Sequence, residues 1–172
     1  MYVDADFAGL YGYENIQDPD CVRSRSGFAI MLGDSPVSWG SKLQTEVASS
    51  TMEAEYIALS NSMKKLIPLR VTYHDLIYAL DLKVDKSSEI TTVFEDNQAA
   101  LILARLIDPP RLTPRSKSIA IKYHWFRQYL KEGEITISAI STDFQKANIF
   151  TKPLVQIKFE RERQMIMGWQ PP

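Results

Sequence analysis

Within residues 87–107 the sequence pattern changes abruptly, from one typical of strands to one typical of helices. The stretch "SSEITTVFED" is dense in β-branched residues, which favour strands, and "NQAALILARLI" has helical spacing and stops before two prolines. Asp96 stands at the junction between the two patterns. Because ligands of an open α/β sheet gather beyond the carboxyl ends of its strands, Asp96 is placed to build a site. The sequence therefore predicts an α/β fold with a candidate site at this strand end.

The rest of the chain supplies further strands and helices around this unit. "MYVDADF" and "GFAIMLGD" have strand patterns, and "VSWGSKLQTEVASS" follows a turn and could pair back as the third strand of an antiparallel meander. Residues 50–80 have helical spacing, with Ser50 or Thr51 as the N-cap. Pro68 is expected to kink that helix or to divide it in two. An aromatic helix "AIKYHWFRQYLKEG", a strand "EITISAI" and a final helical region are expected to follow.

Length and composition restrict the class of protein. A chain of 172 residues suits one domain, which we divide into a core over about 1–152 and a C-terminal helical extension over 153–172. With 20 basic against 21 acidic residues, only local patches could attract nucleic acid. The single cysteine excludes a disulfide framework and a cysteine zinc cluster. No apolar run approaches the roughly 20 residues of a membrane span, so we expect no membrane partner and an intracellular setting.

The stretch "SSTMEAEYIALS" contains two glutamates, Glu53 and Glu55, in an otherwise apolar helical pattern. Residues two apart point to different sides of a helix, so one glutamate faces solvent and the other borders the core. A carboxylate at the margin of a core needs a partner, because burying an unpaired charge is costly. From this stretch alone, a charge on the rim of an amphipathic helix is an equally good interpretation.

Three acidic positions in separate elements can converge only through folding: Asp4 in the first strand, a glutamate of the first helix, and Asp96. Mg²⁺ takes oxygen ligands, so such a cluster suits two-metal phosphodiester chemistry. Asp6 shares the strand face of Asp4 and is an alternative. Glu46 and Glu95 adjoin these motifs, and both are expected to be solvated, since strand alternation turns Glu95 away from Asp96.

Several motifs together resemble the ribonuclease H domain at the C-terminal end of the Pol polyprotein of copia-type LTR retrotransposons. The matching stretches run in the order of that family and cover nearly the whole chain. They are "DADFAG", "RSRSGFAIMLG", "VSWGSKLQ", "SSTMEAEYIALS", "EDNQAALILA", "IAIKYHWFR", "GEITI" and "ANIFTKPL".

The resemblance implies a ribonuclease H-like fold: a five-stranded mixed sheet with helices on both faces. Its first strand is central, the first three strands are antiparallel, and the fourth and fifth are parallel to the first. It also implies four acidic residues that bind two Mg²⁺ ions, for which Mn²⁺ can substitute, and cleavage of the RNA strand of RNA–DNA hybrids during reverse transcription.

Matching motifs assign three of these acids to Asp4, Glu55 and Asp96. We favour Glu55 over Glu53 because it immediately precedes the apolar run, as in related domains. The fourth acid belongs to a motif usually written A-D-I-F-T-K, which here is "ANIFTK", so Asn148 stands at a degenerate catalytic position. Ser118 likewise stands where the family commonly has histidine.

These departures leave two functions open. The first is an active Mg²⁺-dependent endoribonuclease, and the second is an impaired or inactive remnant that acts at most as a hybrid-binding module. The resemblance also implies a reverse transcriptase domain of the same polyprotein as partner, absent upstream of this chain, so that the first strand could be clipped. For an intact element it implies a cytoplasmic virus-like particle.

Basic residues near the aromatic helix are the candidates for phosphate contacts with a hybrid, although a solvated basic loop is an equally good interpretation. They are Arg111, Arg115, Lys117, Lys122 and Arg127. Such contacts would position a hybrid without reading its bases. His124 lies among aromatic residues, where a structural role is more common than a catalytic one. The C-terminal stretch is assigned to packing.

Overall fold

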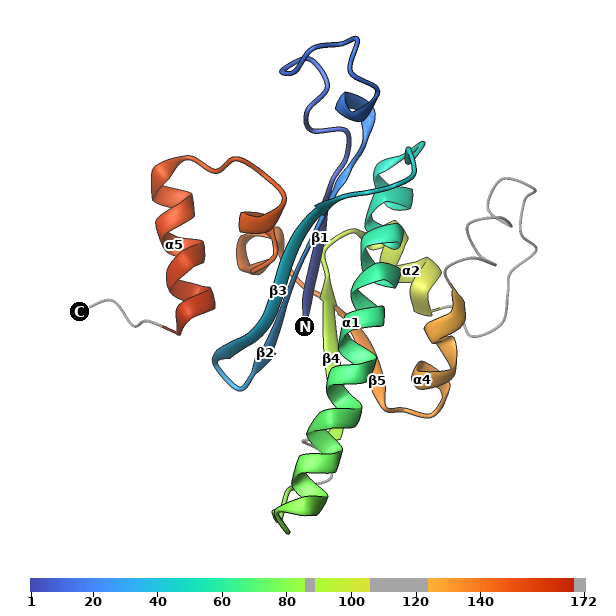
Figure 1. The fold of residues 1–172 in the computed structure, drawn as a ribbon, viewed down its shortest axis with the longest axis vertical. Helices are drawn as coiled ribbons and strands as arrows, with labels where there is room; N and C mark the ends of the chain where they lie inside the picture. Colours follow the sequence, from blue (N-terminus) through green and yellow to red (C-terminus); the bar gives the residue numbers. More distant parts are fainter. Residues whose placement is uncertain (86–88, 106–123, 169–172) are drawn as a thin grey trace.

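The computed structural model describes residues 1–85, 89–105 and 124–168. Its five strands form one sheet in the order β3-β2-β1-β4-β5 (Figure 1). The first three strands are antiparallel, whereas β4 is parallel to β1 and β5 is parallel to β4. The predicted mixed sheet with a central first strand is therefore confirmed. The strands are β1 (Tyr2–Asp6), β2 (Arg25–Leu32), β3 (Ser35–Leu43), β4 (Thr91–Glu95) and β5 (Ile135–Ala139).

Helices cover both faces of this sheet (Figure 1). One face carries α1, α2 and α4, and the other carries α5 with the short helix η5. The aromatic helix expected from residue 120 is described from residue 124 onward, as η3 and α4. The helices are η1 (Pro19–Val22), α1 (Thr51–Ala79), α2 (Gln98–Arg105), η3 (His124–Phe126), α4 (Arg127–Lys131), η4 (Thr142–Phe144), η5 (Asn148–Phe150) and α5 (Gln156–Met167).

Helix α1 is continuous over 29 residues. Ser50 is its N-cap and accepts a hydrogen bond from the Glu53 amide, while the Glu53 carboxylate accepts one from the Ser49 amide at 2.8 Å. These two contacts hold the residues just before the helix and its first turn together, and they fix where the helix starts. Pro68 lies inside the helix, so the expected division into two helices is wrong. Buried residues on both sides of Pro68, such as Leu66 and Arg70, hold the helix against the sheet, and this packing outweighs the lost backbone hydrogen bond.

The main core lies between α1 and the sheet. Side chains from one face of β1, β2, β4 and β5 meet the apolar side of α1 there. Tyr56 and Leu59 of α1 are fully buried, as are Val3 and Val93 of the parallel pair β1 and β4. Because side chains alternate along a strand, the neighbours of Val3 on β1, including Asp4, point to the opposite face.

The close approach of η5 to Gly27 of β2 positions the helices on the second face of the sheet. A β-carbon at Gly27 would lie 2.6 Å from Thr151 Cγ2 and 2.8 Å from Phe150 Cβ, so only glycine lets η5 lie this near β2. Gln145 adds a buried link, because its side-chain amide donates to the carbonyl oxygen of Val3 at 2.8 Å. These contacts hold the segment after η5 directly over the central strand.

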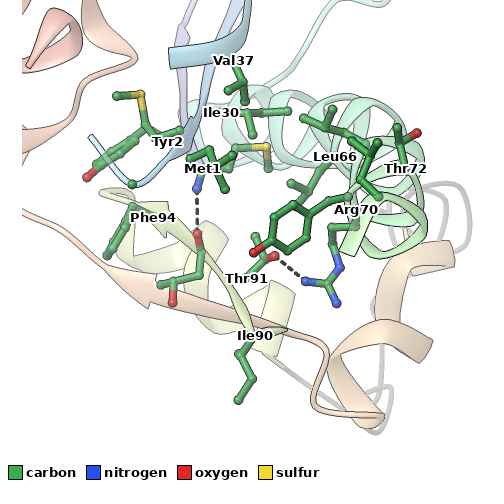
Figure 2. A pocket seen from close by; sticks show the side chains of 17 residues that line it. Met1, Tyr2, Ile30, Val37, Leu66, Arg70, Thr72, Ile90, Thr91 and Phe94 are labelled. Carbon is green, nitrogen blue, oxygen red and sulfur yellow. Dashed lines mark hydrogen bonds between the residues drawn. The ribbon is translucent and has the colours of Figure 1, made fainter. Parts of the chain in front are cut away.

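A mainly apolar cavity of about 400 Å³ lies at the end of the sheet where β1 begins (Figure 2). Leu66 and Tyr73 of α1, Ile30 of β2 and Phe94 of β4 are among the residues that line it. The amino group of Met1 lies beside this cavity and donates to the carbonyl oxygen of Thr92 at 2.7 Å. Burial, with a contribution from Lys146, lowers the pKa of this amino group to about 5.

Candidate metal centre

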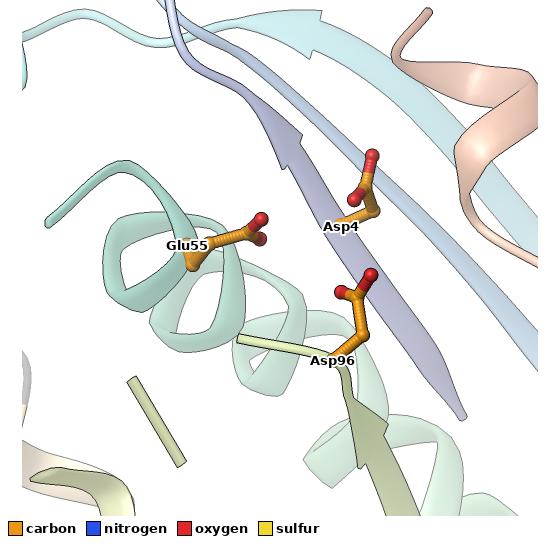
Figure 3. A group of neighbouring side chains, drawn as sticks. All are labelled: Asp4, Glu55 and Asp96. Atoms are coloured by element: carbon orange, nitrogen blue, oxygen red, sulfur yellow. The ribbon is translucent and has the colours of Figure 1, made fainter. Parts of the chain in front are cut away.

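Three carboxylates from three elements converge at one end of the sheet (Figure 3). Asp4 comes from the middle of β1, Glu55 from the first turns of α1, and Asp96 directly follows β4. One oxygen of each lies within 4.8 Å of the others. Asp4 and Glu55 are buried and Asp96 is half-buried. The predicted convergence of these three positions is therefore confirmed.

The two glutamates of α1 have separate positions. The Glu53 carboxylate accepts from the amide and the hydroxyl of Ser49 at the start of the helix. Glu55, two residues later, points toward the aspartates (Figure 3). Their different directions follow from the helical repeat, and they confirm that Glu55 rather than Glu53 faces the pair. Asp6 is half-buried and does not belong to the group of converging carboxylates.

The carboxylates of Glu55 and Asp96 have little compensation from the described residues. Burial raises the pKa of Glu55 to about 10, with further contributions from Glu95, Asp4 and Asp96. Burial also raises the pKa of Asp4, although Lys152 opposes that rise. Within the described residues, Glu55 Oε2 and Asp96 Oδ1 are buried without a hydrogen-bond partner. Buried charges need a counter-charge, so this site favours a cation.

Lys152 supplies one positive charge at the edge of the cluster. Its ammonium lies 3.0 Å from Asp4 Oδ1 and 3.1 Å from Asn148 Oδ1, and the Thr151 hydroxyl donates to the other oxygen of Asp4. Burial acts to lower the pKa of Lys152, but Asp4 and more distant acids outweigh it, so the pKa is raised. The ammonium therefore remains charged and partly neutralises Asp4.

Asn148 stands beside the cluster, at the start of η5. It is fully buried, its amide nitrogen donates to the carbonyl oxygen of Thr142 at 2.9 Å, and its amide oxygen accepts from Lys152. Asn148 is thus connected to Asp4 through the ammonium of Lys152. Thr142 also donates to Asp96 Oδ2 at 2.7 Å, so the two sides of the site share this residue.

Glu95 corrects a sequence expectation. It is fully buried rather than solvated, and its carboxylate accepts from the Asn97 amide at 2.9 Å. Strand alternation does turn Glu95 away from Asp96, but it places Glu95 on the same face as Val93, which is the core face under α1. Burial raises the pKa of Glu95 to about 8, with contributions from Asp96 and Asp4. The spacing of Val93 and Glu95 was the signal that could have revealed this. Glu46, also expected to be solvated, is half-buried and engaged in an interaction.

The donor set fits a hard divalent cation. Asp4, Glu55 and Asp96 offer only carboxylate oxygens, which Mg²⁺ prefers, and two of these oxygens are buried without a partner. Mn²⁺ accepts the same ligands. No cysteine or histidine takes part in this group.

A second cavity, of about 730 Å³, lies beside Thr151 and Lys152, and its lining contains three basic residues against one acidic residue, Asp6. Arg23, Arg25 and Lys152 line it, together with the exposed ring of Tyr13. Arg23 is paired with Asp20 at 2.9 Å, and Arg25 donates to Ser41 at 3.3 Å. No sequence signal marks these arginines as site residues, because only folding brings the ends of the long loop after β1 beside η5.

Most of the predicted phosphate-contacting residues, together with Ser118, lie outside the described residues: Arg111, Arg115, Lys117 and Lys122. Arg127 is described on α4, where it is half-buried and hydrogen-bonded to the buried Tyr56. This contact ties Arg127 to the core. His124 is the first residue of η3.

Comparison with known proteins identifies relatives of the chain. It is 31% identical over 165 residues to the retrovirus-related Pol polyprotein from transposon TNT 1-94 of Nicotiana tabacum, a match covering 96% of this chain. It is 32% identical over 159 residues to the corresponding polyprotein from transposon RE2 of Arabidopsis thaliana, covering 92% of the chain. The chain belongs to the retrovirus-related Pol polyproteins of transposons. It spans only about 10 to 11% of the length of these relatives.

A shorter similarity extends over 70 residues, 41% of this chain and 44% of the relative, and is 41% identical to secreted RxLR effector protein 161 of Plasmopara viticola. No protein-family model matches the chain, and no solved structure gives a significant match. In the part of the Pol segment that the structure describes, no helix has both the length and the apolar character needed to cross a bilayer.

Proposed function

We propose that this Pol segment is a ribonuclease H that cleaves the RNA strand of RNA–DNA hybrids with Mg²⁺. The observation that carries the proposal is the convergence of Asp4, Glu55 and Asp96, with two buried unpartnered oxygens, at the end of a sheet of the expected topology. Similarity to transposon Pol polyproteins supports a reaction that belongs to reverse transcription. The reverse transcriptase domain of the same polyprotein is the proposed partner, and a cytoplasmic virus-like particle the proposed location.

The residues divide the chemistry among them. Asp4, Glu55 and Asp96 would hold the divalent ion, which would supply an activated water and would stabilise the leaving oxygen. Thr151 and Lys152 keep the Asp4 carboxylate in place, as their contacts with its two oxygens show. Arg25 in the adjoining cavity attracts the phosphate backbone of the substrate. A protein that binds mainly backbone groups reads little sequence, and contacts with 2′-hydroxyls distinguish RNA from DNA.

A second candidate is a hybrid-binding module without turnover. Asn148 favours it, because an amide carries no negative charge for a second divalent ion and here binds the ammonium of Lys152. In this alternative the cationic cavity still holds nucleic acid while the acidic centre holds too little metal for cleavage.

A cleavage assay separates the two candidates. The purified 172-residue chain is incubated with an end-labelled RNA–DNA hybrid over a range of Mg²⁺ and Mn²⁺ concentrations, with RNA duplex and DNA duplex as comparison substrates. We expect cuts only in the RNA strand of the hybrid. Asp96→Asn should reduce the rate by on the order of a hundredfold or more, whereas Glu53→Gln, outside the cluster, should retain it.

The outcomes are distinct. Cleavage that persists in Asp96→Asn would come from a contaminating nuclease or another site, and would refute the proposed centre. Hybrid binding without cleavage at any metal concentration would favour the binding module.

A further inference from the structure

The two oxygens of the Asp96 carboxylate have different surroundings. Asp96 directly follows β4, is half-buried, and points toward Asp4 and Glu55 (Figure 3). Its Oδ2 accepts a hydrogen bond from the Thr142 hydroxyl at 2.7 Å. Its Oδ1 is buried and has no hydrogen-bond partner among the described residues. The protein therefore fixes one oxygen of Asp96 and leaves the other available to a cation.

The pairing of β4 with β5 brings Thr142 to Asp96. The two strands are parallel and end together, since Glu95 is paired with Ala139. One more backbone bond follows, in which the Ile140 amide donates to the carbonyl oxygen of Glu95 at 3.1 Å. Asp96 directly follows Glu95, and Thr142 lies three residues after Ala139. The register of the sheet thus sets the chain after β5 beside Asp96.

The backbone of Thr142 is held from the other side of the site. Its carbonyl oxygen accepts from the side-chain amide of Asn148 at 2.9 Å and from the Gln145 amide at 3.3 Å. Asn148 and Gln145 are both fully buried, so the surrounding packing keeps these donors in place. Thr142 is exposed itself, yet buried groups anchor it.

The local helix does not need the Thr142 hydroxyl. Thr142 is the first residue of η4, but the N-cap is Ser141, whose hydroxyl accepts from the Asp143 amide at 3.4 Å. Loss of the Thr142 hydroxyl would leave this cap intact. The hydroxyl contacts Asp96 instead, which connects it with the acidic centre.

The other aspartate of the centre has a similar contact. Thr151 donates its hydroxyl to Asp4, and the Thr151 amide donates to the carbonyl oxygen of Asn148 at 3.1 Å. Thr142 and Thr151 both belong to the segment after β5, and both are bonded to Asn148. One segment of the chain therefore supplies a threonine hydroxyl to each aspartate.

A hydroxyl that donates to a carboxylate restricts how that carboxylate can turn. Such a bond is charge-assisted and stronger than a bond between neutral groups. With Oδ2 held by Thr142, the Asp96 carboxylate cannot rotate about its last side-chain bond without breaking this contact. Groups that orient a metal ligand in this way typically change metal affinity or activity by about tenfold to a hundredfold.

We infer that Thr142 is a positioning residue of the acidic centre, whose hydroxyl holds Asp96 so that Oδ1 faces the divalent ion. This inference rests on the proposed function, because it takes that ion to be the one used in cleavage. Thr142 acts through Asp96 and touches neither the ion nor the reacting phosphate. The inference also assigns Oδ1 as the oxygen of Asp96 that binds the ion.

Binding of Mn²⁺ without nucleic acid tests this role independently of cleavage. Electron paramagnetic resonance of free Mn²⁺ measures its affinity for the 172-residue chain. Thr142→Val removes the hydroxyl and keeps a β-branched side chain, and it should weaken Mn²⁺ binding by about tenfold to a hundredfold. Thr142→Ala removes the same hydroxyl and should show the same loss. Thr142→Ser keeps the hydroxyl and should bind Mn²⁺ like the wild type.

Thr136→Val is the matched control. Thr136 is exposed on β5, and its hydroxyl is bonded to the Thr92 hydroxyl at 3.4 Å, away from the carboxylates. This variant should bind Mn²⁺ like the wild type, and in urea unfolding in EDTA it should have a midpoint close to that of Thr142→Val. Wild-type Mn²⁺ affinity in Thr142→Val, with a loss of stability that Thr136→Val does not share, would show a merely structural role and overturn the inference.

A double-mutant cycle shows whether Thr142 acts through Asp96. Asp96→Asn alone should weaken Mn²⁺ binding. Adding Thr142→Val should weaken it no further, because the carboxylate that Thr142 holds is already gone. Additive losses would mean that Thr142 acts on another group, and they would overturn the inference.

The inference and the proposed function can fail separately. In hybrid cleavage, Thr142→Val should raise the Mg²⁺ concentration for half-maximal rate by the same factor, with an unchanged KM for hybrid at saturating Mg²⁺. If the wild type cleaves hybrid but Thr142→Val keeps the wild-type Mn²⁺ affinity and Mg²⁺ requirement, the inference is wrong and the proposed function stands. If Thr142→Val loses Mn²⁺ affinity but the wild type cleaves no hybrid, the positioning role stands and the ribonuclease is refuted. A wild-type chain that binds no Mn²⁺ overturns the inference outright.

Discussion

Replacing the buried Glu95 by glutamine should stabilise the metal-free protein at neutral and higher pH. Burial raises the pKa of Glu95 from an ordinary 4.5 to about 8, so the folded protein holds this proton over a pH range in which the unfolded chain has lost it. Between these two values the folded state binds more protons, and the free energy of unfolding must fall as the pH rises. Glutamine does not titrate, so the free energy of unfolding of the variant does not fall with pH for this reason.

The magnitude follows from the two pKa values. Each pKa unit is worth about 1.4 kcal/mol, so the loss from Glu95 amounts to about 3 kcal/mol at pH 7 and about 5 kcal/mol above pH 8. Glutamine can still accept the hydrogen bond from the Asn97 amide that Glu95 accepts at 2.9 Å. The charge of Glu95 is also the second contributor to the raised pKa of Glu55. Removing that charge should therefore lower the pKa of Glu55, which adds to the stability of the variant at higher pH.

Urea unfolding in EDTA at pH 4.5, 6, 7 and 8 measures this difference. Glu95→Gln and the wild type should have similar stability at pH 4.5, and the variant should gain about 3 kcal/mol by pH 7. Glu14→Gln, on the exposed loop after β1, is the control for the change of residue type and should follow the wild type. Parallel stability curves for Glu95→Gln and the wild type would show that Glu95 does not hold a proton in the folded protein, and the reasoning would be refuted.

Three further perturbations test other parts of the structure. Asn148→Asp should lower the Mg²⁺ requirement and raise hybrid cleavage by on the order of tenfold to a hundredfold, and an unchanged Mg²⁺ titration would contradict this prediction. The variant should also lose about 1 to 3 kcal/mol in the free energy of unfolding, because the hydrogen bond from Asn148 to Thr142 is lost. Gly27→Ala should push η5 from β2 and destabilise the fold by about 1 to 3 kcal/mol in urea unfolding, whereas Gly12→Ala on the exposed loop, also strained by its positive φ, should leave the contacts of η5 intact when these are followed by NMR. Acetylating Met1 should stabilise the protein at pH 5 by up to about 4 kcal/mol and not above pH 8, because a lowered amine pKa means that the unfolded state binds more protons between these values; equal stability at pH 5 would refute a buried amine.

The sheet and the converging acids could be predicted because their signals are local. The junction at Asp96, the strand of Asp4 and the apolar run after Glu55 each combine a secondary-structure pattern with one charged residue. Strand alternation and helical spacing then decide which way these side chains point. The resemblance to known motifs supplied the order of the strands, which spacing alone does not contain.

The contacts of the second layer could not be predicted in the same way. The position of Lys152 over Asp4 depends on a glycine 125 residues earlier in the chain, which lets η5 approach β2. The burial of Glu95 was missed because alternation indicates two faces of a strand and does not say which one is covered. Likewise, packing on both sides of Pro68 kept α1 continuous against its local tendency.

The ammonium of Lys152 has a consequence for how the protein matures. Because it already lies against Asp4, the newly made chain contains a counter-ion of its own and can complete its fold where free divalent metal is scarce. Under the proposed function, loading with metal would be an exchange of cations, in which the incoming ion competes with a tethered amine for the same carboxylate. Under the proposed function, this competition would keep the acidic centre free of divalent metal until that ion is abundant enough to displace the tethered amine.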